Sequence, residues 1–146
     1  MKAYLWLRIG SVLALVHAIL HTVGGVYGKP EPGAAATAVA AMKANIFPLM
    51  GLPRSFWMFY RGMGLAVTVF LIVSAVALWQ LSTLAKVGEL RLRPLYWTFG
   101  VGFSCFAVIS WTYFFAGAWA TELLIAGCLG MAIVASGRAD QGIERQ

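Results

Sequence analysis

The chain has 146 residues, of which 61% are hydrophobic and only 11% are charged. A soluble domain carries about 25% charged residues, so this composition excludes an ordinary soluble protein and indicates a membrane protein. The net charge of +6 does not indicate a nucleic-acid partner, because the Lys and Arg residues flank apolar segments and no polar domain is left to form a basic groove.

Four continuously apolar segments have about the 20 residues that a helix needs to cross a bilayer. They cover approximately residues 4–26, 56–85, 94–115 and 119–136. Strands of a transmembrane barrel alternate apolar and polar residues over about ten positions, which these segments do not. We therefore predict an all-α fold, in which residues 1–146 form one integral membrane domain built as a bundle of four transmembrane helices.

The basic residues predict how the helices are oriented, because cytoplasmic loops carry an excess of Lys and Arg. With both termini in the cytoplasm, seven basic residues lie inside and four lie outside. The inside set is Lys2, Arg8, Lys86, Arg91, Arg93, Arg138 and Arg145, and the outside set is Lys29, Lys43, Arg54 and the membrane-embedded Arg61. The pattern predicts an N-in, C-in, multi-pass membrane protein.

The start of the chain also has features of a cleaved signal peptide. Lys2 and Arg8 precede an apolar run, and an alanine-rich stretch begins at Ala34. Because the alanines lie well beyond the end of the apolar run, and the run is itself long enough to span, we favour a retained helix.

The first span contains two histidines, His17 and His21, four residues apart. Residues at this spacing share one face of a helix, and Gly10, Ala14 and Ala18 lie on the same face. Small residues four apart are typical of close helix contacts in membranes. We therefore expect both imidazoles to point into the bundle.

The long outer loop, residues 27–55, begins with a stretch rich in Pro and Gly that excludes helix. Residues 34–45 are good helix formers, and Pro48 and Pro53 are expected to end this segment. The sequence predicts a short interfacial helix that lies on the outer leaflet. A lid over a pocket between the spans is the second interpretation.

Ionisable residues inside spans cost free energy and by default indicate function. In the predicted topology Arg61 lies about 8 Å below the outer end of its span, at 1.5 Å per residue. Tyr113 and Glu122 fall in the same outer half of the bilayer as the two histidines. We predict a polar pocket there, whose ligand-binding residues are His17, His21, Arg61, Tyr113, Glu122, Trp57 and Tyr60. A structural alternative is that Arg61 and Glu122 pair only to lower their insertion costs.

Histidines at this spacing can also chelate zinc or copper from one helix face. Glu122 is the one obvious further ligand, and the positive charge of Arg61 opposes a bound cation. We therefore predict no cofactor. Binding of a metal, haem or chlorophyll through His17 and His21 is a secondary hypothesis.

The end of the first span, His-Thr-Val-Gly-Gly at residues 21–25, and the opening of the second, Ser-Phe-Trp-Met-Phe-Tyr at residues 55–60, carry a resemblance. They resemble a family of uncharacterised small four-helix bacterial integral membrane proteins, and the likeness covers nearly the whole chain. The resemblance implies the four-helix fold and a place in the bacterial cytoplasmic (inner) membrane, and it gives no information about activity.

Three functions are compatible with these features. The first is binding of an amphipathic or lipid-like small molecule in the polar pocket, with membrane lipids as partners. As an enzyme, it would use His17, His21 or Glu122 as catalytic candidates. The alternative is a non-catalytic accessory subunit of a larger membrane complex or a homo-oligomer, and the second alternative is the metal or tetrapyrrole site. The sequence leaves open whether the protein is an enzyme.

Overall fold

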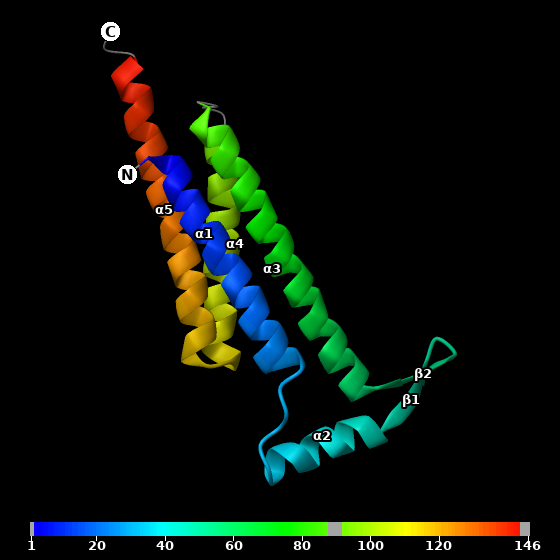
Figure 1. The fold of residues 1–146 in the computed structure, drawn as a ribbon. Helices are drawn as coiled ribbons and strands as arrows, with labels where there is room; N and C mark the ends of the chain where they lie inside the picture. The colour runs from blue at the N-terminus through cyan, green and yellow to red at the C-terminus, as the bar shows by residue number, and fades with distance from the viewer. Residues whose placement is uncertain (1, 88–91, 144–146) are drawn as a thin grey trace. The chain divides into compact units, whose positions relative to one another are not determined.

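The computed structural model describes residues 2–87 and 92–143. Figure 1 shows a mostly helical chain with one small hairpin. The helices are α1 (Ala3–Leu20), α2 (Ala34–Ala44), α3 (Phe56–Lys86), α4 (Arg93–Tyr113) and α5 (Ala116–Ile143). A π-helical segment, His21–Val26, extends α1, and strands β1 (Ile46–Leu49) and β2 (Leu52–Ser55) join α2 to α3.

The four predicted spans are confirmed as helices. Within the described residues, four helices are long and apolar enough to cross a membrane: Ala3–Val26, Phe56–Lys86, Arg93–Tyr113 and Ala116–Gly137. Their boundaries follow the predicted ones closely, except that the last helix begins at Ala116 rather than at residue 119. The all-α, multi-pass membrane architecture is thus supported, and the N-in, C-in orientation stays a prediction.

The chain divides into two compact units. Unit 1 comprises residues 1–17 and 71–146, and unit 2 comprises residues 18–70. Unit 1 therefore contains most of α1, the second half of α3, α4 and α5. Unit 2 contains the π-helical segment, α2, the hairpin and the first half of α3.

Close helix packing in unit 1 depends on small residues, as predicted for α1. A Cβ atom added to Gly10 would lie 3.5 Å from Cβ of Cys128 and 3.7 Å from Cδ1 of Leu78, so α1 contacts both α5 and α3. The hydroxyl of Ser11 donates a hydrogen bond of 2.7 Å to the carbonyl of Ala75. Helices α4 and α5 lie side by side (Figure 1).

In unit 2, polar side chains join the end of α1 to α3. Nε2 of His21 lies 3.0 Å from the carbonyl oxygen of Gly64, to which it donates a hydrogen bond. The hydroxyls of Thr22 and Thr68 lie 2.9 Å apart. The hydrogen bond from the Tyr27 amide to the Thr22 carbonyl spans five residues, as the wider turn of a π-helix requires. His21 therefore makes an interhelical hydrogen bond.

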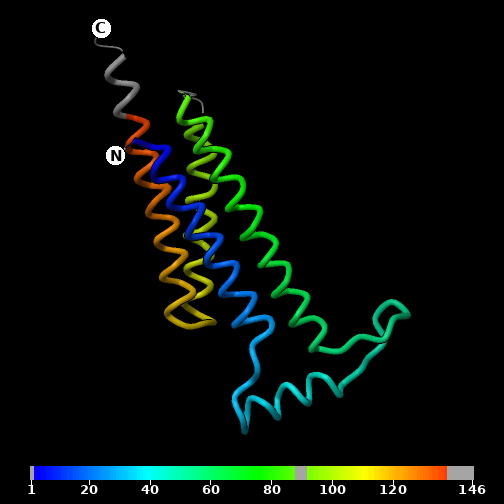
Figure 2. The backbone as a smooth tube through the Cα atoms, in the orientation of Figure 1, coloured from blue at the N-terminus to red at the C-terminus, as the bar shows by residue number. Residues whose placement is uncertain are grey.

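The sequence did not predict the hairpin. Its turn is formed by Met50 and Gly51, with φ of 50° and 81°, and positive φ at both central residues is typical of a type I′ turn. Pro48 pairs with Pro53 next to the Leu49–Leu52 pair that flanks the turn. Hydrogen-bonded and non-hydrogen-bonded pairs alternate along an antiparallel ladder, and the pair next to the turn is hydrogen-bonded. The two prolines therefore form a non-hydrogen-bonded pair, where the missing proline N–H groups cost no hydrogen bond between the strands. Figure 2 traces this path from the loop through α2 and the hairpin into α3.

Gly64 should tolerate no side chain. A Cβ atom there would lie 2.9 Å from Cγ2 of Val26, which is 3% exposed. Overpacking of this kind costs about 1–3 kcal/mol, more than the roughly 0.5–1 kcal/mol that Ala gains over Gly in a helix. We expect Gly64→Ala to lower the free energy of unfolding by about 1 kcal/mol, measured by SDS titration followed by circular dichroism.

Gly62 provides the matched control, because a Cβ atom at that position meets nothing within 4 Å. Gly62→Ala should leave stability unchanged or raise it slightly. Adding Val26→Ala to Gly64→Ala should restore part of the lost stability. Equal stability of the Gly62→Ala and Gly64→Ala proteins would show that the contact with Val26 is unimportant.

Candidate functional site

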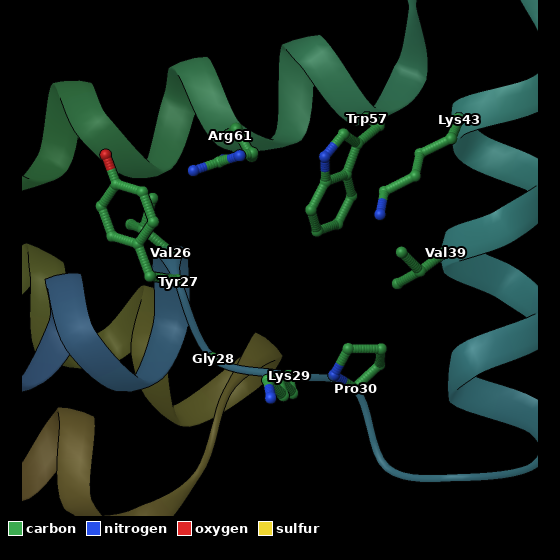
Figure 3. Close-up of a pocket in the computed structure, with 9 residues that line it drawn as sticks. All are labelled: Val26, Tyr27, Gly28, Lys29, Pro30, Val39, Lys43, Trp57 and Arg61. Carbon is green, nitrogen blue, oxygen red and sulfur yellow. The ribbon is translucent and has the colours of Figure 1, made fainter.

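Unit 2 contains a pocket between the end of the π-helical segment, the loop that follows, α2 and the first turns of α3 (Figure 3). Its volume is about 210 Å³. It is lined by Val26, Tyr27, Gly28, Lys29, Pro30, Val39, Lys43, Trp57 and Arg61. We call it the cationic pocket, because three of these side chains are basic and none of the described residues that line it is acidic.

Local structure brings the cationic side chains together from three elements. Trp57 and Arg61 lie four residues apart on α3 and therefore share a face. Val39 and Lys43 have the same spacing on α2, and Lys29 comes from the loop. Figure 3 shows Trp57 and Lys43 pointing into the space between α2 and α3, and Arg61 turned toward Tyr27.

The start of α3 is fixed by contacts with the hairpin. The amide of Met58 donates a 3.3 Å hydrogen bond to the hydroxyl of Ser55, which satisfies a backbone donor at the helix N-terminus. The ring of Phe47 stacks on Phe59 with centroids 6.0 Å apart, and its centroid lies 5.0 Å from that of Phe56. These contacts hold the helix turn that carries Trp57.

Two of the three cations lie over aromatic rings. Cζ of Arg61 is 4.7 Å from the ring centroid of Tyr27, and Nζ of Lys43 is 5.0 Å from that of Trp57. Cation–π contacts of this kind contribute about 0.5–1 kcal/mol at exposed sites. The three basic side chains make the lining of this pocket positively charged.

A second pocket adjoins the first and shares Gly28, Lys29, Pro30, Val39 and Trp57 with it. Its volume is about 390 Å³. The residues it adds are small, apolar or aromatic: Gly24, Gly25, Ala35, Ala38, Met42 and Tyr60. We call it the apolar pocket. The two pockets together therefore have a region lined by basic residues beside a region lined mainly by small, apolar and aromatic residues.

A separate polar cluster lies buried in unit 1. The hydroxyl of Ser110 donates a 3.0 Å hydrogen bond to Oε1 of Glu122, and Nε2 of His17 lies 4.0 Å from the same oxygen. The three residues are 4%, 3% and 8% exposed in that order. Among the described residues, Oε2 of Glu122 has no hydrogen-bond partner.

The predicted site residues therefore fall into three groups. Trp57, Tyr60 and Arg61 line the two pockets, and His21 bonds to α3 in the same unit. His17 and Glu122 form the buried cluster of unit 1. Tyr113 is the last residue of α4, is 77% exposed and is not among the residues that line either pocket, and its role in the site stays a prediction. The pairing of Arg61 with Glu122 stays a prediction.

The sequence analysis missed three residues of the cationic pocket, namely Tyr27, Lys29 and Lys43. Lys29 lies three residues after the first predicted span, and Lys43 lies in the predicted helix of the outer loop. The lysines were used only as markers of topology. The two lysines line the same pocket as Arg61 only because the chain folds so that α2 lies near the start of α3. The sequence around each lysine does not reveal this fold.

No group of three or more His, Cys, Asp or Glu side chains that could hold a metal ion occurs among the described residues. No protein-family model, curated protein or solved structure matches the chain. The resemblance to small four-helix bacterial membrane proteins accordingly stays a prediction.

Proposed function

We propose that this membrane protein binds an amphipathic, lipid-like small molecule in the adjoining cationic and apolar pockets of unit 2. One observation carries the proposal: a pocket lined by three cations shares a wall with a larger pocket lined by small and apolar residues. An amphipathic molecule has the same two parts, a polar head and an apolar chain.

The apolar part of the ligand occupies the apolar pocket against α2. The 390 Å³ of this pocket lies within the range of about 300–1,000 Å³ that is usual for small-molecule sites. Ala35, Ala38 and Met42 lie on one face of α2, at three- and four-residue spacing. This face gives an apolar chain a continuous surface of small side chains and one flexible thioether.

The polar head of the ligand occupies the cationic pocket, where Arg61 binds it with the flanking lysines. Tyr27 and Trp57 are aromatic residues of the kind enriched where a helix meets the membrane surface. In the N-in, C-in orientation the pockets open at the outer face of a bacterial inner membrane. The lipid-like ligand then enters from the outer leaflet.

Ala38→Trp tests the apolar half of the site without changing any charge. The indole fills the apolar pocket, so the variant should retain less than about one-tenth of the lipid that co-purifies with the unchanged protein, a loss of about 1.4 kcal/mol in binding free energy. The measurement is native mass spectrometry of the purified protein, with quantification of the extracted lipid.

Ala40→Trp is the matched control, because Ala40 lies on α2 but outside the residues that line either pocket. This variant should retain its lipid. If Ala38→Trp retains as much lipid as Ala40→Trp, the proposed site is wrong. If the native complex instead contains a second protein and no lipid, the accessory-subunit hypothesis replaces it.

A further inference from the structure

We infer that the head held in the cationic pocket is an anionic phosphate group with no cationic group attached beyond it. The inference rests on the proposed function and deepens it by naming the chemical class of the ligand. The three cations come from three elements: Lys29 from the loop, Lys43 from α2 and Arg61 from α3.

The arrangement suits phosphate better than carboxylate. A carboxylate offers two oxygens in one plane, which a single guanidinium satisfies from one side. A phosphate group offers several strong acceptor oxygens in a tetrahedral arrangement, so donors that approach from different elements can each bind one. Lys29, Lys43 and Arg61 line one pocket and come from the loop, from α2 and from α3, so they offer donors to such a group from more than one element.

The charge of the pocket also disfavours a zwitterionic head. Three basic side chains and no acidic one line the described pocket. A choline or ethanolamine group would bring a fourth positive charge close to these three, without a carboxylate among the lining residues to receive it. Like charges disfavour one another, so the pocket discriminates against zwitterionic phosphate heads.

Two of the cations are positioned before a ligand arrives. The contacts of Lys43 with Trp57 and of Arg61 with Tyr27, at 5.0 and 4.7 Å, restrain side chains that are otherwise among the most mobile. They also attract each cation to its own ring face and so offset the repulsion between neighbouring positive charges. Such preorganisation lowers the entropy that binding must overcome.

The test compares ligands that share one pair of acyl chains and differ in the head. Delipidated protein is titrated with dioleoyl phosphatidic acid, phosphatidylglycerol and phosphatidylcholine, with oleic acid and inorganic phosphate as further ligands, and the complexes are quantified by native mass spectrometry. We expect phosphatidic acid and phosphatidylglycerol to bind about tenfold more tightly than phosphatidylcholine or oleic acid, a difference of about 1.4 kcal/mol.

The double variant Lys29→Gln/Lys43→Gln should reduce this preference about tenfold, because the phosphate loses two of the three cations that line the pocket. The control, Arg54→Gln/Lys86→Gln, removes the same net charge from positions outside both pockets and should keep the preference. Loss of the preference in both double variants would overturn the inference, because bulk charge and not the pocket would then set it.

The remaining outcomes separate this inference from the proposed function. If all lipids bind equally well and Ala38→Trp abolishes this binding, the preference for a phosphate head is wrong and the proposed lipid site is retained. Failure of every lipid to bind overturns the proposed function itself. If inorganic phosphate displaces phosphatidic acid at equal concentration, the ligand of the cationic pocket is free phosphate and not the phosphate head of a lipid.

Discussion

Gly28→Ala is expected to deform both pockets and to abolish lipid retention in a protein that still inserts into the membrane. A Cβ atom at Gly28 would overlap the backbone carbonyl oxygen of Gly24 and lie 2.9 Å from its carbonyl carbon. A side chain could relieve this overlap by changing its rotamer, but a backbone carbonyl cannot. The backbone of the loop must therefore move. Because Gly28 lines both pockets, that movement changes the site directly. Lipid retention should fall at least tenfold, about 1.4 kcal/mol, by native mass spectrometry.

Gly24→Ala is the control for this experiment. Gly24 lies in the π-helical segment and lines the apolar pocket, yet a Cβ atom there meets nothing within 4 Å. The variant should keep its lipid. Circular dichroism should show the same helix content in both variants, since the change at Gly28 falls in the loop after the π-helical segment. Full lipid retention by Gly28→Ala would show that the loop is not part of the binding site.

The spans were predictable from the sequence because their main determinant is a length requirement. A bilayer needs about 20 apolar residues in a row, and a count along the chain finds such runs without knowledge of any contact. Predicted and observed boundaries agree at Phe56 and differ by three residues at Ala116. The alanine-rich helix of the outer loop was predicted for the same kind of reason, since propensity and flanking prolines are local properties.

The hairpin was not predictable because it depends on how two short segments pair with one another, and not on the composition of either segment alone. Pro48 and Pro53 normally indicate the end of regular structure, and the strands have only four residues each. Their compatibility with a ladder depends on register: they face one another at a pair that needs no amide donor. The turn adds a second obstacle, because Met50 occupies a left-handed position where Asn or Gly is usual.

Only the part of the site that lies on α3 was predictable from the sequence. Arg61 was identified because an ionisable residue inside a span is unusual, and Trp57 and Tyr60 lie near it on the same helix face. Lys29 and Lys43 belong to other elements, and only the path of the loop brings them to α3. Tyr113 was included for its depth in the bilayer, and depth does not say which way the last residue of a helix points.

His17→Leu and Glu122→Leu should each destabilise the protein, and the double variant should recover much of the loss. Either single change leaves a buried polar side chain without one of its neighbours in the cluster with Ser110, which costs about 1–3 kcal/mol. Replacing both members by apolar side chains removes the polar pair altogether and is often close to neutral. The free energies of unfolding in an SDS titration should therefore give a coupling of about 0.5–3 kcal/mol between the two positions.

Glu122→Gln separates geometry from charge in the same cluster. The amide oxygen of Gln still accepts the hydrogen bond of Ser110, so this variant should be more stable than Glu122→Leu if the 3.0 Å bond to Ser110 is the main stabilising contact. Strictly additive losses in His17→Leu and Glu122→Leu would contradict the argument, since residues that stabilise one another are non-additive. Lipid retention provides the functional comparison: unchanged retention in folded Glu122→Gln would assign this buried cluster to stability, and the pockets of unit 2 to binding.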